Sequence, residues 1–373
     1  MNFKKPKAII FFQYLPPWRI DVFNEMAKYY QLTIVYTNAE TEGFKYDRED
    51  LLNRLDKDIE NIFLTNGFKI GKRPIRLGIF KLIKTIKPDI VFSHEYSPVS
   101  IILATFLKLN YFNFQYVITT SDNTFISEGV KGVKFFFRKY VLSVADALVV
   151  YSKAVKEFYK GNFSGLRVEI CPNIQNPDTL LEYRQYFPSI LNNYINKFGL
   201  KESKIILYTG RLENVKGLDL LLEAFAKSMN SGFKIVLVGD GNEKENLKQK
   251  CKDLNIEDQV IFAGFCSGKE LYAWYDLANF YVLPSRFEPF GAVVNEALVF
   301  GCPVMASKYI GAVDFVNRSN GLLFDPLNEH QFVENLNIFY ERTRKLNSKE
   351  KMNLMPVSFS EYVKVFYEIY KVN

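Results

Sequence analysis

Short apolar runs alternate with longer amphipathic segments along almost the whole chain. The runs at residues 7–14, 32–37 and 204–210 are apolar at consecutive positions, which predicts strands buried on both faces of a parallel sheet. The segments at residues 18–30 and 218–229 place apolar residues at helical spacing, which predicts helices that cover such a sheet. The repeated strand and helix units favour an α/β fold.

The alternation stops in a polar, Pro-containing stretch around residues 173–203 and then starts again. A chain of 373 residues is long enough for two domains, each with its own core. We therefore predict two doubly wound Rossmann-like domains, with ligands in the crevices at the carboxyl ends of their strands. If those ends face each other, the site lies in the cleft between the domains. The predicted parts are an N-terminal domain, a C-terminal domain and a final helix that packs on the N-terminal domain, at residues 1–178, 179–356 and 357–373.

The bulk composition narrows the function only slightly. A formal charge of +7 suits an anionic partner, whether a nucleic acid, an acidic membrane surface or a phosphorylated small molecule. The four cysteines, Cys171, Cys251, Cys266 and Cys302, show neither a C-x-x-C pair nor a disulfide framework, which is typical of reduced thiols in the cytoplasm. No apolar stretch reaches the roughly 20 residues of a membrane-spanning helix, so none is predicted.

The stretch YTGRLENVKG combines glycines and cations where a predicted strand leads into a predicted helix. Gly210 and Arg211 end the strand, and Lys216 stands just before the helix. Glycine lets a ligand approach the backbone, and a helix amino end favours an anion. A diphosphate would fit this turn; the alternative is that the two cations are solvated loop charges.

A second glycine pair, Gly239 and Gly241, follows the predicted strand at residues 234–238. A dinucleotide fingerprint would need a third glycine, but position 244 is a lysine, so a tight turn explains the pair equally well. The chain has no G-x-x-x-x-G-K-[ST] motif, which removes the main support for P-loop phosphoryl transfer.

One apolar helix, predicted in GAVVNEALVFG, contains a single ionisable residue, Glu296. A carboxylate in such a helix needs hydrogen-bond donors, which the two neighbouring hydroxyls of a ribose or a structural ion pair could both supply. Glu288, in the preceding loop, could accept hydrogen bonds from another sugar. The first turn of the helix also directs unpaired backbone N–H groups toward the same space.

Several motifs together resemble the donor domain of glycosyltransferase family 4, a family of retaining enzymes with the GT-B fold. They are E-P-F-G-x-V-x-x-E-A, in which seven residues separate the two glutamates, with G-R-L-x-x-x-K-G and V-G-D-G before it and N-G-L-L-F after it. The resemblance covers roughly residues 204–326, and the two-domain pattern extends it over most of the chain.

The resemblance implies a role for each donor-site residue. Arg211 and Lys216 would hold the diphosphate of a nucleotide sugar, Glu296 the ribose diol, and Glu288 the hydroxyls of the donor sugar. The other residues implied in donor binding are Gly210, Gly239, Gly241, Pro289, Phe290 and Gly291, together with Phe265 and Cys266 beside the base.

The first domain offers fewer candidates. His94 ends a predicted strand, where the family often has a histidine facing the donor sugar; a satisfied structural histidine is the alternative. Arg19 follows Pro16 and Pro17, where many relatives have a glycine-rich loop, and could still reach an anionic acceptor at the start of a helix. Asp122 and Asn123 are further acceptor candidates.

A retaining transfer requires a stabilised leaving diphosphate and an acceptor hydroxyl held at the anomeric carbon. No enzyme nucleophile is evident, and the resemblance implies that the leaving phosphate helps to deprotonate the acceptor. The catalytic residues are predicted to be Arg211, Lys216, Glu288 and His94. Asp56 and Asp58 form a D-x-D string, but they are predicted on a charged surface helix, so we expect neither a metal nor a cofactor.

Basic and aromatic residues concentrate in two segments of the first domain, residues 71–87 and 130–140. Such faces can lie on anionic lipid, or they can be solvated lysines above a core-facing stripe. Nucleic acid is disfavoured because no known binding module appears.

The sequence therefore predicts a metal-independent, retaining hexosyltransferase. Its predicted location is the cytoplasm, with peripheral attachment to the inner face of the cytoplasmic membrane as a further option. It would move a sugar from a UDP- or GDP-sugar to a saccharide or lipid-linked saccharide of a bacterial surface glycan. The alternatives are a GT-B sugar-nucleotide epimerase and a non-catalytic binding or scaffold subunit.

Overall fold

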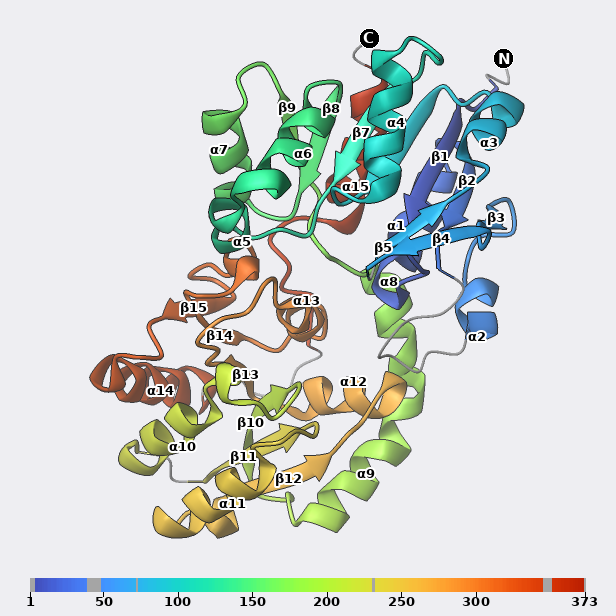
Figure 1. Ribbon diagram of the computed structural model, residues 1–373. Coiled ribbons are helices and arrows are strands. Elements are labelled where there is room, and N and C mark those ends of the chain that lie inside the picture. The colour runs from blue at the N-terminus through green and yellow to red at the C-terminus, as the bar shows by residue number, and fades with distance from the viewer. Residues whose placement is uncertain (1–3, 39–47, 72, 230–231, 345–350, 372–373) are drawn as a thin grey trace. The chain divides into compact units, whose positions relative to one another are not determined.

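The computed structural model describes residues 4–38, 48–71, 73–229, 232–344 and 351–371. Contacts between residues divide the chain into two compact units. Unit 1 consists of Met1–Ile174 and Ser358–Asn373, and unit 2 consists of Gln175–Val357. Figure 1 shows that each unit contains a central sheet flanked by helices.

Unit 1 is built on a seven-stranded parallel sheet. Its strands are β1 (Lys7–Phe12), β2 (Gln31–Tyr36), β3 (Glu60–Phe63), β6 (Ile90–His94), β7 (Gln115–Thr119), β8 (Ala147–Val150) and β9 (Arg167–Ile170), in the order β3-β2-β1-β6-β7-β8-β9. In the register, Ile10 of β1 lies opposite Ile34 of β2 and Phe92 of β6. The chain adds β2 and β3 on one side of β1 and then returns to add β6 on the other, which makes the sheet doubly wound.

Helices cover both faces of this sheet (Figure 1). They are α1 (Ile20–Ala27), α3 (Ile79–Ile86), α4 (Pro98–Lys108), α5 (Thr124–Gly129), α6 (Gly132–Leu142), α7 (Lys153–Asn162) and α15 (Phe359–Lys371), with α2 (Arg48–Asn53) and the 3-10 turn η1 (Pro17–Arg19) outside the main layers. Alternate strand residues point to opposite faces. Ile9 and Phe11 accordingly join a buried cluster with residues of α3, α4, α6 and α7.

The final helix α15 belongs to unit 1 and packs against α1. The Tyr30 hydroxyl donates a hydrogen bond of 2.7 Å to the Phe366 carbonyl, and the Gln115 amide donates one of 2.8 Å to the Ile369 carbonyl. The helix starts with a side-chain cap, in which the Glu361 amide donates to the Ser358 hydroxyl at 3.2 Å.

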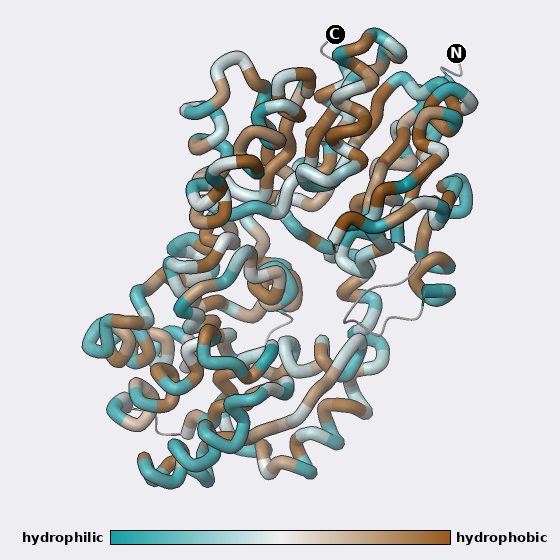
Figure 2. Tube along the Cα trace, in the orientation of Figure 1, coloured by the Kyte–Doolittle hydropathy of each residue, from teal (hydrophilic) through white to brown (hydrophobic). Residues whose placement is uncertain are grey.

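Unit 2 is built on a six-stranded parallel sheet. Its strands are β10 (Lys204–Thr209), β11 (Phe233–Val238), β12 (Val260–Gly264), β13 (Phe280–Leu283), β14 (Val304–Ser307) and β15 (Gly321–Phe324), in the order β12-β11-β10-β13-β14-β15. This sheet is doubly wound around the β10 and β13 pair. Figure 2 shows the apolar residues along the strands and hydrophilic residues along the outer helices of this unit.

The helices of unit 2 form two groups. In one, α10 (Leu218–Lys227) packs on α11 (Lys244–Asp253) and α14 (Glu329–Arg344); in the other, α12 (Gly268–Leu277) packs on α9 (Phe187–Phe198) and α13 (Ala292–Val299). Shorter elements are α8 (Pro177–Leu181) and the 3-10 turns η2 (Glu182–Tyr186), η3 (Asn214–Lys216), η4 (Glu257–Gln259) and η5 (Gly311–Phe315). None of the helices in the described part of the chain combines the length and apolarity needed to cross a bilayer.

The structure differs from the sequence analysis in several local assignments. The units divide after Ile174 instead of residue 178, because Gln175 is hydrogen-bonded to α13. The polar stretch at residues 173–203 contains α8 and α9. The basic segment at residues 71–87 is not one helix: its first part forms β5 (Arg73–Arg76), which pairs antiparallel with β4 (Gly67–Ile70). Asp56 and Asp58 lie in the turn after α2, not on that helix.

Candidate active site

In unit 2 the neighbouring strands β10 and β13 mark the point where the winding of the sheet changes direction. Ligands of doubly wound sheets bind outside the carboxyl ends of the strands at such a point. The loop after β10 carries Gly210, Arg211 and Lys216, and the loop after β13 carries Glu288. The topology therefore brings two stretches that are far apart in the chain to the same edge of the sheet.

These two loops are tied to each other by Arg286. Its guanidinium makes a two-pronged ion pair with Asp219, at 2.7 Å on both prongs, and donates to the Asn214 carbonyl at 2.8 Å. Its amide donates to the Val215 carbonyl at 2.9 Å. Gly217 allows this approach, because its φ is +67° and a Cβ there would lie 2.2 Å from the Pro284 carbonyl oxygen.

Lys216 and Glu288 form an ion pair across the two loops. Both side chains are mostly buried, with 12% and 17% of their surface exposed. The backbone of Glu288 is fixed separately: its amide donates to the Tyr309 carbonyl, and its carbonyl accepts from the Gly311 amide. Arg211 lies closer to solvent, with 71% of its side chain exposed, and pairs with Glu213 at 2.7 Å.

Glu296 lies on α13 and is held by two protein donors. The Gln175 amide donates to one carboxylate oxygen at 3.0 Å, and the Tyr275 hydroxyl donates to the other at 2.8 Å. Burial raises the pKa of this carboxyl, whereas both hydrogen bonds lower it. The side chain is only half-buried, and a carboxylate has acceptor positions beyond these two hydrogen bonds.

A buried chain of hydroxyls continues behind Glu296. Because Tyr275 donates to the carboxylate, the Thr209 hydroxyl must donate to Tyr275, at 2.7 Å. Tyr281 in turn donates to the Thr209 carbonyl at 3.2 Å. Burial is the main cause of the raised pKa of Tyr281, and Glu296 and Glu288 both raise it further. Both glutamates therefore act on the same buried phenol, which belongs to β13.

Close packing between loops is sufficient to require glycine at two of the predicted donor positions. Gly239 has a φ of +145°, and a Cβ there would lie 1.9 Å from the Gly210 carbonyl oxygen. A Cβ on Gly241 would lie 2.3 Å from the Leu212 carbonyl oxygen. The Leu212 amide donates to the Asp240 carbonyl at 2.9 Å, so a backbone hydrogen bond joins the loops after β10 and β11. Gly239 and Gly241 hold the Arg211 loop in place, whatever else they contact.

The remaining predicted donor residues lie in different surroundings. Phe290 is buried and packs edge-on against Phe315, and Gly291 precedes α13 with a φ of +95°. Pro289 sits between Glu288 and Phe290, close to Gly311. Phe265, directly after β12, has 78% of its side chain exposed. Burial raises the pKa of the neighbouring Cys266 thiol.

Unit 1 has its own point of reversed winding, between β1 and β6, and His94 ends β6 there. Its ring stacks on Phe12 of β1, with centroids 4.2 Å apart, and its Nδ1 lies 2.9 Å from the Thr119 hydroxyl. Its Nε2 lies 3.4 Å from a Glu95 carboxylate oxygen. Burial lowers the pKa of His94 to about 4, so the ring is neutral at pH 7.

Glu95 organises the polar groups around this histidine. Its φ of +61° is in the left-handed region that a residue with a side chain rarely adopts. The carboxylate accepts hydrogen bonds from the Ser121 amide at 2.8 Å, the Ser121 hydroxyl at 2.5 Å and the Thr120 hydroxyl at 3.0 Å. These three hydrogen bonds hold the Glu95 carboxylate 3.4 Å from His94 Nε2.

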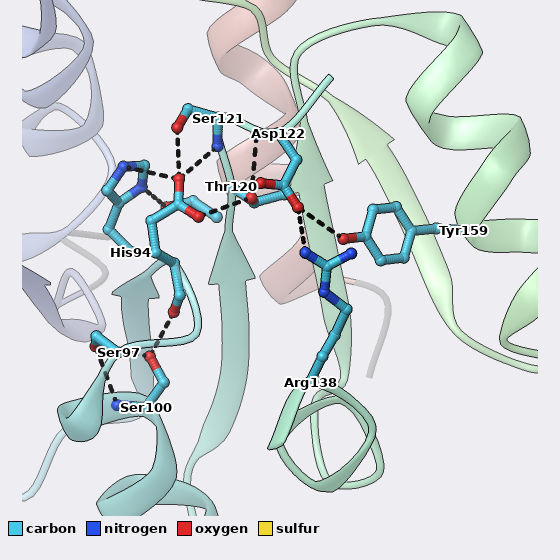
Figure 3. A network of polar contacts seen from close by, with 10 residues as sticks. His94, Ser97, Ser100, Thr120, Ser121, Asp122, Arg138 and Tyr159 are labelled. Carbon is cyan, nitrogen blue, oxygen red and sulfur yellow. Dashed lines mark hydrogen bonds and ion pairs between the residues drawn. The ribbon is translucent and has the colours of Figure 1, made fainter. Parts of the chain in front are cut away.

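Asp122 is the centre of a second, buried cluster. Figure 3 shows its carboxylate facing Arg138 and Tyr159. The Arg138 guanidinium donates at 2.6 Å and the Tyr159 hydroxyl at 3.2 Å. Burial, helped by the charge of Glu95, raises the pKa of Asp122 to about 6 despite these partners. Asn123 caps α5 instead, because its side chain accepts from the Ile126 amide at 2.8 Å.

A cavity of about 270 Å³ opens beside this cluster within unit 1. Its lining includes both acids, Glu95 and Asp122, and three cations, Arg73, Lys134 and Arg138. A cavity lined by charges of both signs suits a polar ligand with hydroxyl groups or an anionic group.

Arg19 does not have the surroundings predicted for it. Only 3% of the residue is exposed, and its guanidinium lies over the Tyr151 ring, 4.9 Å from the centroid. A buried cation stacked on an aromatic ring of the same unit has a packing role; its contact with an acceptor stays a prediction.

Comparison with known proteins supports a glycosyltransferase. The family model described as Glycosyl transferases group 1 matches residues 192–353. An uncharacterized glycosyltransferase of Haemophilus influenzae is 26% identical over 90% of this chain and 89% of its own length. The lipopolysaccharide 1,2-N-acetylglucosaminetransferase of Salmonella typhimurium is 29% identical over 55% of this chain. Coverage of relatives is uneven: the chain spans 54% of the Salmonella enzyme and 36% of a Methanocaldococcus jannaschii glycosyltransferase.

Solved structures extend the likeness to the whole fold. The lipopolysaccharide outer core galactosyltransferase WaaB in its apo form covers 97% of this chain and is itself covered to 99%, with a TM-score of 0.70 and 18% identity. Anabaena HepE in complex with UDP covers 98% of this chain and is covered to 97%, also with a TM-score of 0.70 and 18% identity. The chain has the GT-B fold.

Within this GT-B chain, several side chains of the candidate site were not singled out from the sequence. They are Gln175, Asp219, Tyr275, Arg286, Glu95, Arg138 and Tyr159. Arg286 and Glu95 lie close in sequence to predicted site residues, and this proximity could have marked them as site candidates. Arg138 lies in a segment interpreted as a basic outer face, and only the packing shows that it turns inward. Among the described residues, no group of three or more His, Cys, Asp or Glu could hold a metal ion.

Proposed function

We propose that the protein is a retaining, metal-independent glycosyltransferase that takes a sugar from a UDP- or GDP-sugar. The observation that carries the proposal is the arrangement at the carboxyl ends of β10 and β13. There the Lys216 and Glu288 pair, the Arg211 cation and the half-buried Glu296 carboxylate surround one edge of a GT-B sheet. A cation paired only with a neighbouring carboxylate can exchange that partner for a diphosphate.

Each group then has a defined task. Lys216 and Arg211 neutralise the charge that grows on the leaving diphosphate, which is the main demand of the transfer. Glu296 accepts the two ribose hydroxyls, while Tyr275 and Gln175 keep its carboxylate oriented. Glu288, released from Lys216 by the diphosphate, accepts hydroxyls of the donor sugar. The relative whose solved structure contains UDP supports a uridine nucleotide as the first donor to try.

The acceptor belongs in unit 1, at the cavity lined by Glu95 and Asp122. The names of two similar proteins refer to lipopolysaccharide, which supports a saccharide or lipid-linked saccharide of a bacterial surface glycan as the acceptor. His94 is neutral at pH 7, which suits the predicted contact with a sugar hydroxyl because the ring adds no charge there.

The test is donor binding by Glu296→Gln. A panel of UDP- and GDP-sugars, scored by ligand-induced thermal stabilisation, first identifies the preferred donor. Glu296→Gln should then bind that donor at least about tenfold more weakly, because an amide can no longer accept both ribose hydroxyls. Glu334→Gln, on the exposed surface of α14, is the matched control. Unchanged affinity in Glu296→Gln would remove the ribose assignment, and stabilisation by no nucleotide sugar would remove the proposed function.

A further inference from the structure

Five large apolar side chains are exposed in a stretch of twelve residues in α5 and α6. The exposed fractions are 72% for Phe125, 37% for Ile126, 71% for Val133, 43% for Phe135 and 63% for Phe136. Lys131, Lys134 and Lys139 are exposed among them. These eight residues are called the α5–α6 surface below. Apolar side chains gathered in this way usually mark an interaction site.

The surface projects from a firmly anchored helix. Arg138, Val141 and Leu142 are the buried residues of α6, and they lie in its second half. In the first turn Val133, Lys134, Phe135 and Phe136 are all exposed, although the Phe135 ring lies 6.4 Å from the Phe163 ring. The helix thus presents its amino-terminal end outward while its other end is fixed in the core.

We propose that the α5–α6 surface docks on a bilayer that contains anionic lipids. Phe and Val side chains between lysines are the composition of segments that enter the boundary between headgroups and acyl chains. Between residues 125 and 139, the three lysines outnumber the one acid, Glu128, and therefore favour a negatively charged surface. A soluble protein partner would not require this surplus of lysines.

The surface adjoins the cavity proposed for the acceptor, and this step rests on the proposed function. Lys134, Phe137 and Arg138 of α6 line the cavity, as does Val130 between the two helices. The same helix therefore faces the cavity with one side and the solvent with Val133 and Phe136. An acceptor saccharide anchored in the bilayer could enter the cavity without leaving its lipid.

The other basic segment predicted to be a membrane face is weaker in the structure. Residues 71–87 divide between β5 and α3, and the exposed Phe80 of α3 is packed into an aromatic cluster with Phe106, Tyr111 and Phe112. The predicted membrane contact is therefore assigned to α5 and α6.

The experiment is co-sedimentation of the full chain with vesicles of phosphatidylcholine alone and of phosphatidylcholine with phosphatidylglycerol. The native protein should bind the mixed vesicles more tightly, and added salt should weaken that binding. The double variant Val133→Ser with Phe136→Ser should lose at least about tenfold in partitioning, because both apolar contacts disappear. The matched control is Met229→Ser with Ile338→Ser, which removes two side chains of unit 2 that are 70% and 48% exposed.

A double charge-reversal variant separates the contribution of lipid charge to vesicle binding from the contribution of apolar contact. Lys131→Glu with Lys139→Glu should abolish the preference for phosphatidylglycerol, whereas Lys201→Glu with Lys252→Glu, on exposed positions of unit 2, should keep it. Binding to neither vesicle by the native protein, or equal binding by the double variant, overturns the proposal; a protein partner captured in its place is an overturning result as well. Thermal stabilisation by the preferred nucleotide sugar, without vesicles, reports the proposed function separately and should be unchanged in all these variants.

Discussion

The two units share the doubly wound sheet topology, but the charged side chains of their sites differ in how far they are exposed to solvent. In unit 2 the ion pairs near the site keep more of their surface exposed: Arg286 and Asp219 are 28% and 31% exposed, and the mostly buried Lys216 and Glu288 still keep 12% and 17%. In unit 1 the corresponding groups are buried: Arg138 and Asp122 are only 5% and 9% exposed, and His94 is neutral.

This difference indicates what each site can do. Partly exposed pairs cost little to separate, because water compensates for the lost partner, so unit 2 can release Arg211 to a ligand easily and Lys216 at a higher cost. Buried pairs are costly to break, so unit 1 keeps its cluster assembled and offers a shaped cavity instead. We infer that unit 2 binds its ligand by exchanging a carboxylate partner for the charge of the ligand. Unit 1 binds its ligand by the complementary shape of a preformed cavity.

The largest expected effect is on transfer by Lys216→Met. If Lys216 exchanges Glu288 for the diphosphate, its removal should lower kcat/KM by about 100- to 1,000-fold, roughly 3–4 kcal/mol. Lys227→Met is the matched control, since Lys227 pairs with Glu329 at the surface of unit 2. Initial rates with the preferred donor measure both. Activity within about threefold of the native protein would show that Lys216 is only a structural partner of Glu288.

The next effect compares the two arginine pairs by stability. Arg138→Met leaves the Asp122 carboxylate buried without its cation and should lower the free energy of unfolding by about 3–5 kcal/mol. Arg286→Met breaks a pair that water can reach and should cost about 1 kcal/mol. Urea unfolding of both variants provides the measurement. Similar losses in the two variants would mean that the contrast in burial has no energetic consequence.

Part of this contrast could be predicted from the sequence. The strands of both sheets are runs of mostly apolar residues, and the predicted motifs stand where such runs end. Arg211 and His94 were therefore predicted at the ends of strands, and Glu288 in a loop that follows one. The strand β4 was missed because all four of its residues are exposed and show no buried face. The helices α8 and α9 were missed because they lie in a polar, Pro-containing stretch.

The energetic state of the charges could not be predicted, because it depends on tertiary packing. Lys134, Arg138 and Lys139 look alike in the sequence, yet only Arg138 turns inward. The left-handed backbone of Glu95 also has no sequence signal, since positive φ values usually indicate glycine or asparagine. The strand order that places β13 beside β10 arises from contacts between distant segments.

A smaller effect concerns how unit 2 orients Glu296. Tyr275→Phe removes a hydrogen bond to the carboxylate without creating a large cavity, so donor affinity should fall by about tenfold, or roughly 1.4 kcal/mol. Tyr281→Phe is the control, because Tyr281 donates to the Thr209 carbonyl instead of Glu296. Equal effects of the two variants would mean that the loss follows general weakening of the hydroxyl chain. Nucleotide-sugar titrations measure both affinities.

The smallest effect is a pH dependence that tests the burial of unit 1. The folded protein raises the pKa of Asp122 from its ordinary 3.8 to about 6, so folding favours the protonated carboxyl. The stabilisation that this gives is fully present below pH 3.8 and is lost as the pH rises through 6. Asp122→Asn cannot titrate, so its deficit in unfolding free energy relative to the native protein should shrink by about 1 kcal/mol between about pH 5 and 7.5.

His94 titrates in an overlapping pH range with the opposite sign, because burial lowers its pKa to about 4 and acidification therefore destabilises the fold. Since the histidine is present in both proteins, its contribution largely cancels in the difference between Asp122→Asn and the native chain. Asp253→Asn, on the polar helix α11, controls for the loss of one carboxylate. A deficit that stays constant or grows with pH would show that Asp122 is ionised as easily as a carboxylate in unit 2, and the contrast between the two sites would then be one of position alone.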